Sequence, residues 1–330
     1  MKHESTYNRQ LDKFYTKPSI AKDCYIVFKD ILQDAKIEDR NLLFIEPSAG
    51  SGAFLDIIQE PKLGFDISPD DPLTIRKNDF LRGNLLEFLN DQERQKQLAF
   101  IGNPPFGTKS KLAIAFVNKA LEYSNIVGFV VPLQFRKWSV QSKIVQNARL
   151  ILDKELPENA FQFMGKDYKV RCCFQVWALE SFPGTFPNLR LTEKPAIDHP
   201  DFVMYQYNRT EQARKFFDYD WDFAVPRQGY LDYSIRAYSK KECDPKHQWI
   251  FFKATDEAAL ERLRKLDFER LSRKNIGIPG FGKADVVQEY EALYQTSTVV
   301  PLRARSMATA IFNIHVARFR DMAEEMSKAA

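Results

Sequence analysis

Four consecutive residues, Asn103-Pro104-Pro105-Phe106, combine an amide, a rigid turn and an aromatic ring. Proline fixes its φ angle and offers a carbonyl group without a competing N–H group. The Asn103 side-chain oxygen and the Pro104 carbonyl can each accept one N–H from an amino group on a flat base, on which Phe106 stacks. The exocyclic amine of adenine is a weak nucleophile, and this grip would direct its lone pair toward an incoming methyl group. The alternative is a plain turn followed by a core aromatic residue.

The apolar run over residues 41–45 predicts a strand that leads into a loop of small residues, 46–52. Gly50 and Gly52 would let the backbone approach a ligand, and we expect a helix to start within residues 53–55. Glu46, at the tip of the strand, is suited to bind an ammonium group. The glycine spacing differs from the G-x-G-x-x-G of NAD enzymes, which argues against a dehydrogenase.

Two further segments, 63–67 and 75–81, are predicted strand tips that each carry an acidic residue. Asp66 is placed where doubly wound folds use a carboxylate to hold ribose hydroxyls, although a helix cap or a turn is the alternative role. Asp79 is suited to accept a hydrogen bond from an adenine amine, and Phe80 is suited to lie beside the adenine ring. Asn103 follows a predicted strand over 97–102, so these groups are expected where open α/β sheets bind ligands.

With these motifs and the segment Phe14-Tyr15-Thr16-Lys17-Pro18, the chain resembles the S-adenosylmethionine-dependent adenine-N6 DNA methyltransferases. Specifically, it resembles the group whose cofactor motifs precede the catalytic motif and whose target-recognition region comes last. The resemblance covers roughly the first half of the chain. It implies a Rossmann-like α/β methyltransferase sheet with helices on both faces, and a smaller C-terminal α+β target-recognition domain.

The resemblance also implies S-adenosyl-L-methionine as the cofactor and double-stranded DNA, with its target adenine flipped out, as the substrate. The implied cofactor-binding residues are Tyr15, Thr16, Pro18, Glu46, Pro47, Ser48, Ala49, Gly50, Gly52, Asp66, Ile67, Asp79, Phe80 and Asn103. The implied catalytic residues are Asn103, Pro104, Pro105 and Phe106, with Phe161 as a second aromatic against the flipped base. Phe163 and Tyr168 are alternatives for that second aromatic, and a plain core role for Phe161 also stays open. Read alone, Thr16-Lys17-Pro18 would simply begin a helix through residues 24–28, with Thr16 or Ser19 near its cap.

Two further β-rich runs, 127–132 and 171–179, predict strands after the turn. A stretch rich in proline and glycine, 181–188, then suggests a boundary. We therefore expect a catalytic domain over 1–182 and a nucleic-acid-binding, target-recognition region over 183–330. In that second region aromatic residues are interleaved with basic residues, whose donors are suited to base edges and phosphates, although a solvated face is the alternative. It ends in an expected amphipathic helix from Ser306 to Ala330.

The amino-acid composition is compatible with a DNA-binding methyltransferase but does not by itself indicate one. The 330 residues carry 48 Lys+Arg against 44 Asp+Glu, a net charge of +4. No run of about 18 apolar residues and no apolar N-terminal signal occurs, so we expect no membrane partner and a cytoplasmic, intracellular protein of prokaryotic, phage or plasmid origin. The four cysteines and four histidines lack metal-ligand spacing, which predicts no metal site. A cognate restriction endonuclease is a candidate partner, and the oligomeric state stays open.

Two other classes of function compete with DNA methylation. Asn-Pro-Pro-aromatic turns also occur in enzymes that methylate RNA bases and in enzymes that methylate a glutamine amide of translation factors. All these acceptors are planar nitrogens, so the turn alone does not separate them. A catalytically silent nucleic-acid-binding module is the third possibility, which the intact turn and glycine loop argue against.

Overall fold

The computed structural model describes residues 15–163, 165–273 and 278–294. The helix expected from Ser306 to Ala330 lies outside the described residues, as does Phe14. Within the described ranges, no helix has both the length and the apolar character needed to cross a membrane.

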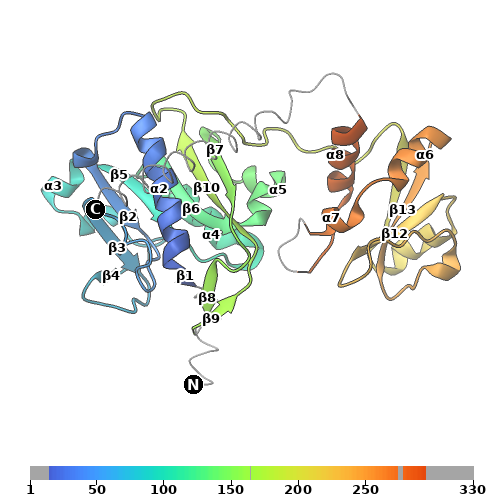
Figure 1. The fold of residues 1–330 in the computed structure, drawn as a ribbon, viewed down its shortest axis with the longest axis horizontal. Helices are drawn as coiled ribbons and strands as arrows, with labels where there is room; N and C mark the ends of the chain where they lie inside the picture. Colours follow the sequence, from blue (N-terminus) through green and yellow to red (C-terminus); the bar gives the residue numbers. More distant parts are fainter. Residues whose placement is uncertain (1–14, 164, 274–277, 295–330) are drawn as a thin grey trace, which may run out of the picture.

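Seven strands form a central sheet in the described part of the chain, in the order β4-β3-β2-β5-β6-β10-β7 (Figure 1). The five strands from β4 to β6 in this order are parallel, and β10 is antiparallel to both of its neighbours. The strands are β2 (Leu42–Glu46), β3 (Lys62–Asp66), β4 (Ile75–Lys77), β5 (Gln97–Gly102), β6 (Ile126–Pro132), β7 (Ala148–Glu155) and β10 (Cys172–Leu179). All of them except β7 were predicted, β4 from a strand tip within 75–81 and the others from apolar runs. Those runs are nearly continuous because both faces of the sheet are covered.

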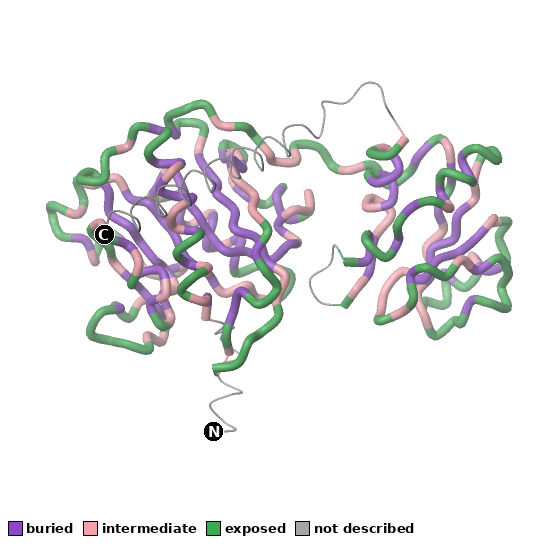
Figure 2. Tube along the Cα trace, viewed as in Figure 1, coloured by how far each residue is buried: buried purple, intermediate pink, exposed green. Residues whose placement is uncertain are grey.

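Helices cover both faces of this sheet, as expected. On one face, α2 (Pro18–Asp34) packs Phe28 and Leu32 against a core that includes Phe44 of β2. On the other face, α4 (Lys111–Leu121) packs Phe116 and Val117 against a core that includes Phe100 of β5. Two short helices, α3 (Asp91–Arg94) and α5 (Trp138–Gln141), complete this part. Figure 2 shows the buried chain running through these strands and helices.

A small sheet lies beside the large one, in the order β1-β8-β9 (Figure 1). Its strands are β1 (Tyr15–Thr16), β8 (Phe161–Phe163) and β9 (Lys166–Tyr168). Thr16 pairs with Phe161, and the Lys17 N–H donates to the Ala160 carbonyl over 3.0 Å. The start of the described chain is thereby fixed to a hairpin far along the sequence.

A third, antiparallel sheet has the order β11-β13-β12 and lies apart from the others in Figure 1. Its strands and the helices that pack near it are β11 (Phe202–Tyr207), β12 (Phe223–Gln228), β13 (Gln248–Ala254), α6 (Glu257–Arg264), α7 (Phe268–Ser272) and α8 (Lys283–Tyr294). It has a core of its own, which includes Phe223, Phe252 and Tyr290. The stretch after β10 is irregular, and Arg190 fixes part of it by donating to backbone carbonyls between Gln141 and Ala148.

Candidate active site

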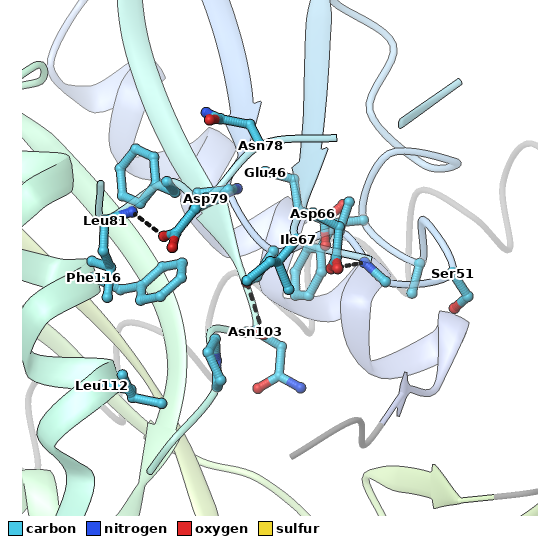
Figure 3. Close-up of a pocket in the computed structure, with 18 of the residues that line it drawn as sticks. Glu46, Ser51, Asp66, Ile67, Asn78, Asp79, Leu81, Asn103, Leu112 and Phe116 are labelled. Atoms are coloured by element: carbon cyan, nitrogen blue, oxygen red, sulfur yellow. Dashed lines mark hydrogen bonds between the residues drawn. The ribbon is translucent and has the colours of Figure 1, made fainter. Parts of the chain in front are cut away.

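A cavity of about 300 Å³ opens where β2, β3, β4 and β5 end (Figure 3). Many of the predicted site residues line it: Tyr15, Thr16, Glu46, Pro47, Ser48, Ala49, Gly50, Asp66, Ile67, Asp79, Phe80, Asn103 and Pro105. The prediction missed other lining residues: Ser51, Ala53, Phe54, Asn78, Leu81, Arg82, Leu112 and Phe116. Five predicted residues do not line it: Pro18, Gly52, Pro104, Phe106 and Phe161.

The glycine loop after β2 adopts the predicted tight turn, but the helix expected after it does not form. Gly50 and Gly52 have φ angles of +53° and +84°, which favour glycine. Residues 51–57 are a series of turns. Asp56 and Ile58 donate to carbonyls four residues earlier, but Ile57 donates to the Phe54 carbonyl, three residues earlier, so the helical pattern of bonds is not continuous. The Leu55 N–H donates to Glu46 Oε2 over 3.1 Å, which joins these turns to the end of β2.

Glu46 is the most deeply buried acid of the cavity, at 2% exposure. Burial raises the pKa of its carboxyl group well above the ordinary value, and the nearby Asp66 and Asp56 raise it further, against the lowering effect of the Leu55 N–H. No lysine or arginine forms an ion pair with Glu46 among the described residues. A cationic ligand group would supply the missing positive charge.

Asp66 and Asp79 also shape the backbone around the cavity. Asp66 accepts from the Gly50 N–H through Oδ2 over 2.9 Å, and from the Ser68 N–H through Oδ1 over 2.8 Å. Its position at the end of β3 therefore ties the glycine loop to the neighbouring strand. Asp79 accepts from the Leu81 N–H over 3.1 Å, as Figure 3 shows. Each carboxylate oxygen keeps a further lone pair for a ligand.

Phe80 and Phe116 form an aromatic wall of the cavity. The Phe80 ring lies between Phe100 and Phe116, with centroid distances of 5.6 and 5.4 Å. Phe116 and Leu112 lie four residues apart on α4, so they face the same side. That spacing, directly after the proline turn, is the sequence signal that would have identified both.

The Asn103 turn begins where β5 ends and reaches the same cavity as Glu46, Asp66 and Asp79 (Figure 3). Ser48 Oγ donates to the Asn103 carbonyl over 3.2 Å, which joins the turn to the glycine loop. Phe106 is half-buried and packs against both cores of the large sheet, so in this conformation its ring faces protein.

Phe161 does not have the exposed ring that a stacking residue needs. It is fully buried, because pairing of β8 with Thr16 turns its ring into the core beneath α2. In this structure Phe161 is thus a core residue. The two alternatives on the same hairpin, Phe163 and Tyr168, have their ring centroids 6.1 Å apart, and Tyr168 is 36% exposed.

Helix α2 begins within the predicted segment Thr16-Lys17-Pro18 and runs through residues 24–28. Lys17 occupies the N-cap position next to Thr16, no side chain caps the helix, and Pro18 takes the first helical position. Pro18 is exposed and thus starts the helix without reaching the cavity.

Two buried polar atoms at the cavity lack a hydrogen-bond partner within the described residues: Thr16 Oγ1 and Asn78 Nδ2. An unpaired buried polar atom costs about 1–3 kcal/mol, which a polar ligand would recover. Together with the buried Glu46 carboxyl group, which has no cationic partner among the described residues, and the aromatic wall, these atoms suit a ligand with a cationic amine, hydroxyl groups and a flat ring.

No protein-family model and no curated protein sequence matches this chain. Among solved structures, it is similar to a Listeria monocytogenes protein described as a class I S-adenosylmethionine-dependent methyltransferase (16% identity, 55% of this chain and 64% of that chain, TM-score 0.38). It is also similar to the M protein of the type I restriction enzyme EcoKI (14% identity, 91% and 72%, TM-score 0.35). A third is the type IIL restriction-modification enzyme MmeI in complex with DNA (12% identity, 90% and 56%, TM-score 0.36). This chain thus spans less than two thirds of the Listeria protein and of the MmeI structure.

Proposed function

We propose that this chain transfers a methyl group from S-adenosyl-L-methionine to the N6 amino group of adenine in DNA. One observation carries the proposal: Asn103 of the Asn-Pro-Pro-Phe turn lines the same cavity as Glu46, Asp66 and Asp79. Groups suited to a charged cofactor and a group suited to an acceptor amine thereby share one space. Methyl transfer requires such proximity, because donor and acceptor must be in contact.

The cavity residues have clear roles toward the cofactor in this proposal. S-adenosyl-L-methionine supplies an electrophilic methyl group when it is bound. Glu46 would attract its ammonium group, Asp66 would accept from ribose hydroxyls, and Asp79 would accept from its adenine amine. Thr16 and Asn78 would form hydrogen bonds with its remaining polar groups. These bonds would remove the free-energy penalty of the two unpaired side-chain atoms.

On the acceptor side, the turn would hold the target amine without a strong base. The Asn103 side-chain oxygen and the Pro104 carbonyl would each accept one N–H, which favours the geometry in which the nitrogen lone pair is free to attack. The target base must leave the duplex at a cost of a few kcal/mol. Stacking on an aromatic residue offsets part of that cost, and Phe163 and Tyr168 are candidates. Phe106 would stack on the base only after its ring leaves the two cores against which it packs.

We further propose that the region from residue 183 onward recognises the DNA target. Two observations support this role: a sheet with a core of its own, and exposed aromatic side chains such as Tyr230 and Tyr238, at 83% and 54% exposure. A cognate restriction endonuclease would be the partner if the chain belongs to a restriction-modification system.

The first prediction is that Asn103→Ala lowers the rate of methyl transfer by about 100-fold or more and leaves cofactor affinity within about twofold of the wild type. The physical reason is that the substitution removes an acceptor for the target amine, while the acids that would hold the cofactor lie on other strands. Labelled methyl transfer from S-adenosylmethionine is measured to duplex DNA, total RNA and a protein extract in parallel. DNA is then digested to nucleosides to identify N6-methyladenine.

Asn125→Ala is the matched control, because Asn125 precedes β6 at the opposite end of the sheet. It should retain both transfer and cofactor binding. Label confined to RNA or protein would overturn DNA as the substrate and keep the chemistry. Joint loss of transfer and cofactor binding in Asn103→Ala would mean that the turn is structural.

A further inference from the structure

Tyr15 of β1 borders the cavity, and its hydroxyl group donates to Asp70 Oδ2 over 2.6 Å. Asp70 lies in the exposed connection between β3 and β4 and does not itself line the cavity. A short bond to a carboxylate is stronger than a bond between neutral groups. The pair therefore joins two segments that are distant in sequence at the border of the cavity.

The Tyr15 ring rests directly on the glycine loop. A Cβ atom added to Gly50 would lie 3.2 Å from Tyr15 Cε1, so the ring approaches as closely as a glycine allows. The Asp70 N–H lies 3.4 Å from the Gly50 carbonyl, to which it donates. Tyr15, Gly50 and Asp70 thus form a closed cycle of contacts.

The chain on the other side of Tyr15 is held independently of Asp70. Thr16 pairs with Phe161, the Lys17 ammonium lies 2.8 Å from Asp167 Oδ1, and α2 begins at the next residue. Losing the bond to Asp70 would therefore release the Tyr15 side chain while the backbone beside it stays in place. Such a side chain can swing away from the cavity without unfolding its neighbours.

We propose that Asp70 is a positioning residue that holds Tyr15 over the cofactor cavity, and that the Tyr15–Asp70 bond slows release of the cofactor. The proposal rests on the cofactor site proposed above. Asp70 acts through Tyr15 in this proposal, because Tyr15 lines the cavity and Asp70 does not. Cofactor exchange then requires that this bond open first.

The test measures the rate at which S-adenosylhomocysteine dissociates from the full chain, by displacement in a stopped-flow instrument, with affinity measured by calorimetry. Tyr15→Phe and Asp70→Ala should each raise the dissociation rate about 3- to 10-fold. The double variant should dissociate no faster than either single variant, because all three lack the same bond. Asp70→Asn should restore part of the slow release, since its amide oxygen can still accept from the Tyr15 hydroxyl.

Tyr25→Phe is the matched control. Tyr25 also donates its hydroxyl to a carboxylate, Glu60 Oε2, over 2.5 Å, but neither residue lines the cavity. Its removal should leave the dissociation rate unchanged. An equal rise of the dissociation rate in Tyr25→Phe would overturn the role of the pair. A double variant whose dissociation rate rises by the product of the effects of Tyr15→Phe and Asp70→Ala would also overturn it.

The two proposals fail in different ways. If the wild-type chain does not bind S-adenosylhomocysteine, the cofactor site is wrong and the role of Asp70 is wrong with it. If the wild type binds and all the Tyr15 and Asp70 variants release the ligand at the wild-type rate, only the role of the pair is overturned.

Discussion

A single buried carboxyl group, that of Glu46, sets the electrostatics of the cavity. Its pKa is raised, first by burial and then by Asp66 and Asp56, and no lysine or arginine of the described chain offsets the charge. The ionised form is therefore unfavourable in the folded protein and is accessible in the unfolded chain. The residue costs stability at neutral pH, and its charge is useful only toward a cationic ligand.

Glu46→Gln should accordingly stabilise the protein and weaken cofactor binding. An ordinary glutamate titrates near pH 4.3, so below that pH the carboxyl is protonated in both states and the variant gains nothing. Between that pH and the raised pKa, the carboxyl group ionises in the unfolded chain but not in the folded one, so the stability advantage of Glu46→Gln over the wild type grows with pH. Above the raised pKa this advantage stays constant. Cofactor affinity should fall about 10- to 100-fold, the usual effect of losing a bond to a charged group.

Thermal unfolding at pH 4 and pH 8 checks the stability of this variant, and calorimetry with S-adenosylhomocysteine checks its affinity. Glutamine can still accept from the Leu55 N–H, so the turns after β2 should persist. A variant that is less stable at pH 8 than the wild type would show that the Glu46 carboxylate is not strained by burial.

At the scale of elements, the fit of α2 on the large sheet depends on a missing side chain. Gly128 lies in β6, and a Cβ atom there would lie 2.7 Å from Phe28 Cδ2 of α2 and 2.8 Å from Phe174 Cζ of β10. Both rings are fully buried. They cannot give way without shifting the helix or the strand.

Gly128→Ala should therefore destabilise the fold by about 1–3 kcal/mol, the usual cost of overpacking a core. Urea unfolding, followed by far-ultraviolet circular dichroism, measures the loss. Gly282→Ala is the control, because its new Cβ would have only an ordinary contact, 3.7 Å from Asp285 Oδ2. Equal stability of the two variants would contradict the close packing described at Gly128.

At the scale of the whole molecule, the described chain holds separate cores. One pair of cores covers the two faces of the large sheet, and another set surrounds the sheet β11-β13-β12. Phe252 is central to that second set: it is fully buried, its ring centroid lies 4.9 Å from that of Phe223, and Phe268 lies 5.5 Å away. Separate cores are what independent stability of the two parts requires.

Phe252→Ala should then remove about 3–5 kcal/mol from the second part alone. We expect DNA affinity to fall while S-adenosylhomocysteine still binds with wild-type affinity. Calorimetric unfolding should show two transitions, of which only that of the second part moves to lower temperature. A single cooperative transition, with both binding activities lost together, would contradict the proposed division near residue 183.

The sequence determined much of the large sheet and of the edge at which the cavity lies. Strands such as β2, β5 and β10 are nearly continuous apolar runs because they are buried on both faces, and this signal is local. Polar residues that end or directly follow such runs, such as Glu46 and Asn103, were then placed at one edge by the parallel arrangement of the strands. Their convergence on one cavity follows from the arrangement of the sheet.

Only the tertiary structure decided which way individual side chains face. Phe161 is buried because its strand pairs with Thr16, a partner that no local pattern identifies. The Glu46 side chain accepts from the Leu55 N–H, nine residues along the chain, in a segment that forms turns and not the expected helix. No local sequence pattern identifies the bond between Tyr15 and Asp70 either. Each of these contacts joins segments that are separate in sequence, so its energy exists only once the chain has folded.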